Sequence, residues 1–207
     1  MTETARHWDA AYRGGADQVS WYQDEARVSL ELIDRLKLAI DAPIIDIGGG
    51  ASPLTADLLD RGHHDLTVLD ISRHALDTAR EKLDARAEEV TWVHADLRNW
   101  HPTRTYQLWH DRAVLHFLTD PQDQRTYTDL LARALVPGGH AIIATFAPDG
   151  PARCSGLPVV RYSAENLSAL LGTDFDLIEK RHETHHTPSG SIQPFTWIAA
   201  RRALSMH

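Results

Sequence analysis

The chain has 207 residues, of which 43% are hydrophobic and 24% charged, the size and composition of one globular domain with a buried core. Its net charge of −8 and the absence of a Lys/Arg run argue against nucleic acid as a partner, because that affinity comes from cations matched to phosphates. There is neither an apolar stretch of the roughly 20 residues that span a membrane nor an apolar leader segment. We therefore expect a cytoplasmic protein without a membrane partner, and nothing in the sequence specifies its oligomeric state.

The first forty residues predict two amphipathic helices. Trp8 and Tyr12 stand four residues apart, on one face of a helix that the pair Gly14-Gly15 breaks. A second helix over 25–37 is indicated by apolar residues at four-residue spacing, namely Val28, Leu32 and Leu36.

From residue 43 onward, short apolar runs alternate with helical segments. The predicted strands are 43–47, 66–69, 90–93, 106–109 and 140–146, followed by a helix over 163–171 and strands near 175–180 and 195–200. Helix starts are expected at Ser52-Pro53, Ser72 and Asp120-Pro121, and the last of these helices should end at Pro137-Gly138-Gly139.

This alternation predicts an α/β fold with a doubly wound, Rossmann-like, mostly parallel seven-stranded sheet and helices on both faces. The last two strands follow each other without a helix, so they should form an antiparallel hairpin at one edge. Ligands of such sheets bind beyond the carboxyl ends of the strands, where the strand order reverses.

A glycine-rich turn follows the first of these strands, in the run Asp46-Ile47-Gly48-Gly49-Gly50. Glycines let the backbone approach a ligand closely, and the next helix offers free N–H groups at its start. Gly-rich turns also have purely structural causes, so the turn alone leaves both interpretations open.

Asp70 ends the second strand, twenty residues after Gly50. This placement suits a carboxylate that accepts both hydroxyl hydrogens of a ribose, although Asp70 is also a plausible helix cap beside Ser72. A dinucleotide fingerprint needs a third glycine where this chain has Pro53. A nucleoside without a diphosphate therefore fits better than NAD.

Polar residues also follow the third and fourth strands. In Ala95-Asp96-Leu97, the carboxylate can accept the amino group of an adenine while Leu97 contacts the ring. The fourth strand ends in His110-Asp111-Arg112, whose first two side chains should point to opposite faces of the sheet.

Taken in order, these features resemble the class I, seven-strand S-adenosylmethionine (SAM)-dependent methyltransferases over residues 43–147. The resemblance implies that SAM is the cofactor. It also implies a set of cofactor-binding residues in this core: Asp46, Gly48, Gly49, Gly50, Asp70, Ile71, Ser72, Asp96, Leu97 and Asp111. Ser52 departs from the pattern, because many members have a further glycine there.

The N-terminal segment, with Trp8, Tyr12 and Trp21, is similar to that of enzymes that methylate elongation-factor lysines and of thiopurine-type small-molecule methyltransferases. That similarity implies a lid in which Tyr12, Arg13 and Trp21 contact the cofactor and Arg13 pairs with its carboxylate. Alternatively, the aromatic residues only pin a helix to the domain. The lysine-modifying group usually has Asp-Lys-Gly after the fourth strand, where this chain has Asp111-Arg112-Ala113.

The sulfonium of SAM supplies an activated methyl group, so the protein needs a base only if the acceptor arrives protonated. We predict Asp111 and His116 as the catalytic residues, Asp111 being equally able to hold the lid or the SAM amino group. A lone His is often structural, despite its useful pKa. The Gly/Pro-rich loop over 148–162 should contribute to acceptor selection.

Two further features predict no chemistry. Cys154, the single cysteine, has no neighbour in sequence that would lower its pKa, and His182, His185 and His186 lack a partner at metal-ligand spacing, so no metal is expected.

The sequence thus predicts a single methyltransferase domain over 1–207, divided into a helical lid (1–40), a SAM-binding core (41–147), and an acceptor-side loop with the hairpin (148–207). The expected reaction is in-line methyl transfer to an O, N or S atom of a small molecule. A protein lysine methyltransferase and a non-catalytic SAM-binding protein remain alternatives, and NAD-dependent oxidoreduction is disfavoured by Pro53.

Overall fold

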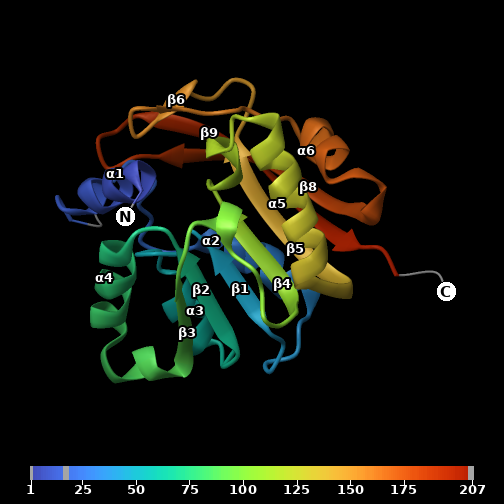
Figure 1. The fold of residues 1–207 in the computed structure, drawn as a ribbon, viewed down its shortest axis with the longest axis horizontal. Helices are drawn as coiled ribbons and strands as arrows, with labels where there is room; N and C mark the ends of the chain where they lie inside the picture. Colours follow the sequence, from blue (N-terminus) through green and yellow to red (C-terminus); the bar gives the residue numbers. More distant parts are fainter. Residues whose placement is uncertain (1, 16–18, 205–207) are drawn as a thin grey trace. The chain divides into compact units, whose positions relative to one another are not determined.

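The computed structural model describes residues 2–15 and 19–204. Its main sheet has seven strands in the order β3-β2-β1-β4-β5-β9-β8 (Figure 1). The strand bounds are β1 Ile44–Ile47, β2 Leu66–Asp70, β3 Val90–His94, β4 Tyr106–Arg112, β5 Leu135–Phe146, β8 Phe175–His186 and β9 Ile192–Arg202. A separate two-stranded sheet joins β6 (Arg153–Cys154) to β7 (Leu157–Pro158). The mostly parallel, Rossmann-like sheet predicted from the sequence is confirmed.

The helices alternate with these strands as expected. Their bounds are α1 Glu3–Tyr12, α2 Arg27–Leu36, α3 Leu54–Asp60, α4 Arg73–Leu83, α5 Pro121–Ala134 and α6 Ala164–Leu171. Short 3-10 turns lie at η1 Asp84–Glu89, η2 Leu97–Asn99, η3 Leu115–Phe117 and η4 Gly172–Asp174. None of the helices in the described part of the chain is long and apolar enough to cross a membrane.

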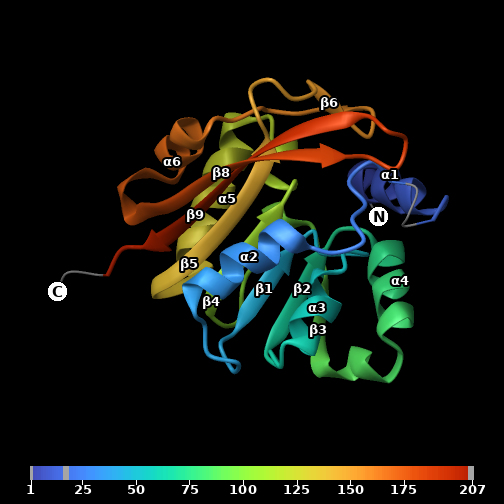
Figure 2. The same ribbon diagram turned by 180° about the vertical axis from the view of Figure 1, so that it is seen from behind.

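The chain divides into two compact units, residues 1–100 with 186–191 and residues 101–185 with 192–207. In the first unit, β1 pairs in parallel with β2 and β2 with β3. Every residue of β1 and β2 is buried, as the continuous apolar runs predict for strands enclosed on both faces. Figure 2 shows α2 and α3 lying on one face of these strands.

Side-chain caps start two of the three helices where the sequence predicts them, whereas the N-cap of α3 is Pro53, which makes no side-chain cap hydrogen bond. Ser72 Oγ accepts from Ala75 N at 3.1 Å at the start of α4. Asp120 Oδ1 accepts from Gln122 N at 2.6 Å at the start of α5. These caps satisfy backbone donors that a helix start leaves without partners, which is why short-range sequence signals locate helix starts well.

The second unit contains β4, β5 and β9. β4 runs parallel to β5, and β9 runs antiparallel to β5, with Ile142 opposite Ala199. Helix α5 lies across β4 and β5 (Figure 1), and its Tyr127 packs edge-on against Trp109 of β4 with ring centroids 5.7 Å apart. The core of this unit is therefore aromatic and closely packed.

One sequence prediction about this unit is wrong. Pro137-Gly138-Gly139 does not end α5, because the helix stops at Ala134 and β5 begins at Leu135. The three residues lie in an irregular stretch of the strand: Tyr106 pairs with Leu135, whereas Leu108 pairs with His140. Because β5 pairs with β4 from Leu135 onward, it includes residues 137–139, although these residues by themselves are typical of a turn.

Candidate functional site

The glycine turn after β1 lies tightly against two carboxylates. A Cβ at Gly50 would stand 2.6 Å from Asp70 Oδ2 and 2.8 Å from the Cβ of Ala75. A Cβ at Gly49 would stand 2.3 Å from Asp46 Oδ2. All three distances are shorter than real Cβ contacts allow, so these positions favour glycine because Asp46, Asp70 and Ala75 occupy the space. Gly48, which precedes them, donates its N–H to Leu69 O at 2.7 Å and so ties the turn to the end of β2.

Asp70 is buried, and its carboxylate accepts from Ser72 N at 2.7 Å. Burial raises its pKa to about 7, and the nearby charge of Asp46 adds to the shift while hydrogen bonds from Ser72, Gly50 and Ile71 oppose it. The residue that caps α4 is Ser72 rather than Asp70. The carboxylate therefore sits in its own turn, facing a second carboxylate.

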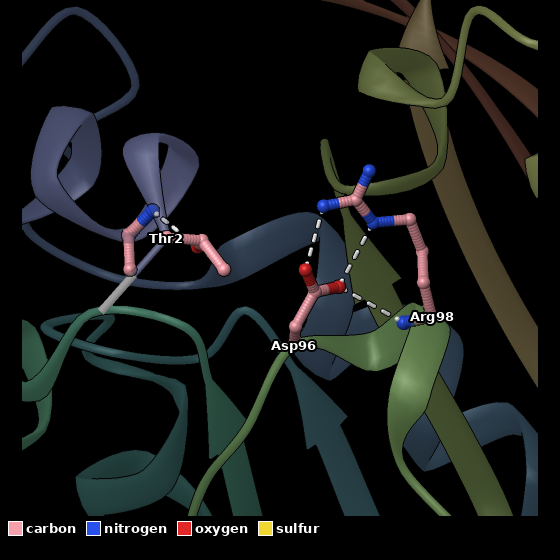
Figure 3. Close-up of polar contacts among 4 residues, drawn as sticks. Thr2, Asp96 and Arg98 are labelled. Carbon is pink, nitrogen blue, oxygen red and sulfur yellow. Dashed lines mark hydrogen bonds and ion pairs between the residues drawn. The ribbon is translucent and has the colours of Figure 1, made fainter.

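Asp96 begins the turn η2 and is paired with Arg98 (Figure 3). Arg98 Nη2 lies 2.6 Å from Asp96 Oδ2, and Arg98 Nε donates to Oδ1 at 3.0 Å. Burial opposes ionisation of Asp96, but the hydrogen bonds and charge of Arg98 outweigh it and the pKa is lowered. Asp96 is thus held as an anion with lone pairs to spare, and Leu97 beside it is buried.

The N-terminal helix brings Tyr12 to the two acids of the turn. The Tyr12 side chain is buried, its hydroxyl accepts from Trp21 Nε1 at 3.2 Å, and it packs with Val19 and Ala75. Burial and the charges of Asp70 and Asp46 raise the pKa of Tyr12. The hydroxyl therefore keeps its proton and can donate a hydrogen bond.

Other parts of the N-terminal segment are less enclosed. Trp21 is half-buried and stacks edge-on against Trp8 with ring centroids 5.7 Å apart. Arg13 is exposed at the C-cap of α1, so its predicted pairing with a carboxylate stays a prediction. Figure 3 shows Thr2 at the other end of α1, where its hydroxyl accepts from Ala5 N at 3.2 Å and starts the helix.

The sequence assigned no role to Asp9, yet this residue fastens α1 to the loop after β2. Its Oδ1 accepts from Ser72 Oγ at 2.7 Å and from His74 N at 3.3 Å. The sequence feature that could have identified Asp9 is its spacing: Asp9 precedes Tyr12 by three residues, so both side chains lie on the same face of the helix.

In the second unit, Asp111 is fully buried and bound by internal donors. Its carboxylate accepts from Val114 N at 2.8 Å, Leu115 N at 3.1 Å and Tyr127 Oη at 2.7 Å. Burial raises its pKa to about 6, and the hydrogen bonds and the charge of His110 limit the rise. These contacts hold the turn after β4 against α5, and they lend no support to Asp111 as a catalytic base or a cofactor ligand.

His116 is also fully buried, between the rings of Phe117 and Phe146. Its Nδ1 accepts from Phe146 N at 3.3 Å, which assigns the ring proton to Nε2, and Nε2 has no hydrogen-bond partner among the described residues. Burial lowers the pKa of His116 to about 3, and the charge of Arg112 contributes. The imidazole is therefore neutral at physiological pH.

The loop over 148–162 is tied to this part of the second unit. Val160 N donates to His116 O at 2.8 Å, and Tyr162 N donates to Phe146 O at 3.0 Å. As the alternation of side chains predicts, His110 turns away from Asp111, its ring centroid lying 6.3 Å from that of Trp197.

The histidines near the end of β8 and the single cysteine form no metal site within the described residues. His182 is exposed and lies 3.7 Å from Asp149, and Cys154 is buried.

Residues 44–139 match the family model described as a methyltransferase domain. A curated relative, the trans-aconitate 2-methyltransferase of Azoarcus sp. (strain BH72), is 33% identical over 117 residues, which are 56% of this chain and 44% of the relative. The match thus spans less than half the length of that protein.

Two solved structures share the fold over nearly the whole chain. A structure described as concerning the conversion of a disulfide bond into a thioacetal group during echinomycin biosynthesis has a TM-score of 0.77 and 21% identity, covering 99% of this chain and 95% of the other. The 1,6-didemethyltoxoflavin-N1-methyltransferase of Burkholderia thailandensis, with bound 1,6-didemethyltoxoflavin and S-adenosylhomocysteine, has a TM-score of 0.74 and 22% identity, covering 97% and 89%. The predicted fold is confirmed, and residues 44–139 match a methyltransferase domain.

Proposed function

We propose that this chain, whose residues 44–139 form a methyltransferase domain within a class I methyltransferase fold, transfers a methyl group from SAM to an O, N or S atom of a small molecule. The observation that carries the proposal is the turn after β1, where Asp46 and Asp70 lie against Gly49 and Gly50 and act electrostatically on the buried hydroxyl of Tyr12. Burial and the charge of Asp46 both disfavour ionisation of Asp70, and hydrogen-bond donors from a ligand would offset this cost.

Each of these residues suits one part of SAM. Asp70 would accept the two ribose hydroxyls, whose protons favour the charged form that burial disfavours. Asp46 would attract the cationic amino group, and Asp96, kept ionised by Arg98, would accept the adenine amino group beside Leu97. The bound S-adenosylhomocysteine of the Burkholderia relative supports this choice of cofactor.

SAM supplies a methyl group already activated by its sulfonium. A lone pair of the acceptor would take this methyl group, and the bonding electrons of the carbon–sulfur bond would remain with S-adenosylhomocysteine. The protein's contribution is to hold both reactants in line and to exclude water, which accounts for much of the acceleration in such reactions.

Neither predicted catalytic residue is suited to remove a proton from the acceptor. Asp111 already accepts three hydrogen bonds, and His116 has a pKa of about 3 with its free nitrogen protonated in the neutral ring. We therefore assign both to positioning and expect an acceptor whose lone pair is available at neutral pH, such as a carboxylate or a ring nitrogen. The relatives named for trans-aconitate and for N1 of didemethyltoxoflavin support this class.

The substitution His116→Asn tests this assignment, because an amide oxygen can replace the Nδ1 acceptor that binds Phe146 N. We expect kcat to fall less than about tenfold, since a lost general base commonly costs 10²–10⁴-fold. The pH profile of the wild-type enzyme should show no inflection that belongs to His116 between pH 5 and 8. A larger loss, together with an inflection that disappears in the variant, would restore His116 as the base.

The proposed function itself is tested by calorimetric titration with SAM, S-adenosylhomocysteine and NAD. We expect micromolar binding of the first two and none of NAD, and we expect Asp70→Ala to abolish binding while leaving the circular dichroism spectrum unchanged. Unchanged affinity in Asp70→Ala would refute the ribose assignment, and NAD binding would refute the cofactor. Tight SAM binding with no turnover on any carboxylate, ring nitrogen or thiol would favour a protein lysine acceptor or a non-catalytic role.

A further inference from the structure

Ser72 connects the acid assigned to the ribose with the N-terminal helix. Its backbone N–H donates to Asp70 Oδ1 at 2.7 Å, and its hydroxyl donates to Asp9 Oδ1 at 2.7 Å. The same hydroxyl oxygen caps α4 by accepting from Ala75 N. A single buried residue thus holds Asp70 with its backbone and α1 with its side chain.

Asp9 is held as an anion at this position. Burial opposes its ionisation, but the hydrogen bonds from Ser72 and His74 and the charges of His94 and His74 outweigh it, so its pKa is lowered. The carboxylate also lies at the N-terminal end of α4, where the helix dipole favours a negative charge. Both ribbon views place α1 beside this end of α4 (Figures 1 and 2).

The contact of Asp9 determines where Tyr12 lies. The two residues are three positions apart on α1 and so share one face of the helix. When Asp9 contacts Ser72, that face brings the Tyr12 ring against Ala75 and close enough to Asp70 and Asp46 for their charges to act on its hydroxyl. The hydrogen bond from Trp21 Nε1 then fixes the hydroxyl.

We propose that Asp9 is a positioning residue for the cofactor site: through Ser72 it latches α1 onto the loop after β2 and thereby holds Tyr12 over the bound SAM. This inference rests on the proposed function. Release of SAM or of its product then requires the contact between Asp9 and Ser72 to open, so the latch governs the dissociation rate of the cofactor.

The substitutions Asp9→Ala and Asp9→Asn test the latch, with Glu3→Gln as the matched control. Glu3 is an exposed acid on the same helix, and it takes no part in the contact with Ser72. Asn keeps an oxygen that can accept from Ser72 but loses the charge, so its effect should be intermediate. It also keeps the test usable if Asp9→Ala proves unstable.

Stopped-flow tryptophan fluorescence would measure the dissociation of S-adenosylhomocysteine from the full chain, with thermal melting recorded in parallel. We expect Asp9→Ala to raise the dissociation rate by about tenfold, equivalent to about 1.4 kcal/mol. Asp9→Asn should raise it less, and Glu3→Gln should leave it unchanged. Hydrogen exchange without ligand should show faster exchange in α1 of Asp9→Ala, with α3 unaffected.

The outcomes separate the two proposals. Wild-type protein that binds neither SAM nor S-adenosylhomocysteine would overturn the proposed function and the latch with it. Normal binding by the wild type, with the same dissociation rate in Asp9→Ala, would overturn the latch alone, even if the melting temperature falls, because Asp9 would then only anchor the helix.

Discussion

Asp70 and Asp111 are both buried carboxylates on parallel strands, yet their surroundings differ. Asp70 is held by backbone donors of its own loop and faces Asp46 across the glycine turn. Asp111 is bound by the hydroxyl of Tyr127, which belongs to another element, and by two backbone N–H groups of the turn that follows it. The difference is that the charge of a neighbouring acid adds to the raised pKa of Asp70, whereas a hydroxyl from another helix binds Asp111 and limits the rise of its pKa.

The largest effect on the cofactor side is expected from Gly50→Ala. The new methyl group would lie 2.6 Å from Asp70 Oδ2, so the turn and the carboxylate must separate. Calorimetry should show SAM affinity reduced by at least about 100-fold, equivalent to about 2.7 kcal/mol. Gly14→Ala is the control, because its Cβ would meet nothing within 4 Å. Equal SAM affinities in Gly50→Ala and Gly14→Ala would contradict the idea that the close approach of Gly50 to Asp70 matters for cofactor binding.

Asp70→Asn should separate binding from stability. The pKa of Asp70 is raised to about 7 from 3.8, so the folded protein binds the proton more tightly than the unfolded chain does. Stability from this group is therefore present below pH 4 and is lost as the pH rises toward 7. The amide cannot ionise, so the variant should bind SAM about tenfold or more weakly but melt at a higher temperature than the wild type at pH 8.

Melting curves of both proteins at pH 5 and pH 8 measure this effect. The difference in melting temperature between wild type and Asp70→Asn should be larger at pH 8. A variant that melts below the wild type at pH 8 would show that the charged carboxylate stabilises the fold, which would contradict the raised pKa of Asp70.

For the surroundings of Asp111, Tyr127→Phe should give the reverse of the result expected for Asp70→Asn: lower stability with nearly unchanged SAM affinity. The variant loses the donor to Asp111 and the acceptor of Trp109 Nε1. Leaving buried polar groups without partners costs about 1–3 kcal/mol, so urea denaturation should reveal reduced stability while the SAM affinity changes less than about twofold. Thr126→Ala, which removes an exposed hydroxyl of α5, is the control. A loss of SAM affinity matching the loss of stability would instead place Asp111 at the cofactor.

The smallest effect is expected from Arg98→Ala. Removing the guanidinium lets the pKa of Asp96 rise, and the side chain of Asp96 loses its bidentate partner. Because Arg98 is partly exposed, solvent screens its charge, and SAM affinity should fall only about two- to fivefold in calorimetry. Arg133→Ala, an exposed arginine of α5, should change nothing. Tighter binding in Arg98→Ala would mean that Arg98 competes with the adenine for Asp96.

Much of the local structure at the proposed cofactor site could be predicted from the sequence, because its determinants are local. The glycine turn, the acid that ends β2 and the cap at Ser72 each lie within a few residues of the backbone that they organise. The alternation of apolar strands and helices predicted the sheet for the same reason, since burial on both faces demands continuous apolar runs.

The second unit was less predictable because its decisive contacts join distant residues. Asp111 accepts a hydrogen bond from Tyr127, 16 residues further along the chain, and Nδ1 of His116 accepts one from the backbone of Phe146, 30 residues away. The sequence identified both as polar residues near a strand end but carried no signal that other elements would occupy them. The prediction that Pro137-Gly138-Gly139 ends α5 was wrong because pairing with β4 outweighed the local preference of these residues for a turn.

By itself, the sequence predicted the glycine turn after β1, the acid that ends β2 and a fold class whose ligands bind at the carboxyl ends of the strands. Only the tertiary structure decided which polar groups are already bound within the protein, and it brought Asp9 to Ser72 across 63 residues of chain. The reason is physical: backbone geometry and capping depend on near neighbours, whereas burial, pKa and hydrogen-bond satisfaction depend on whatever element folds against the group.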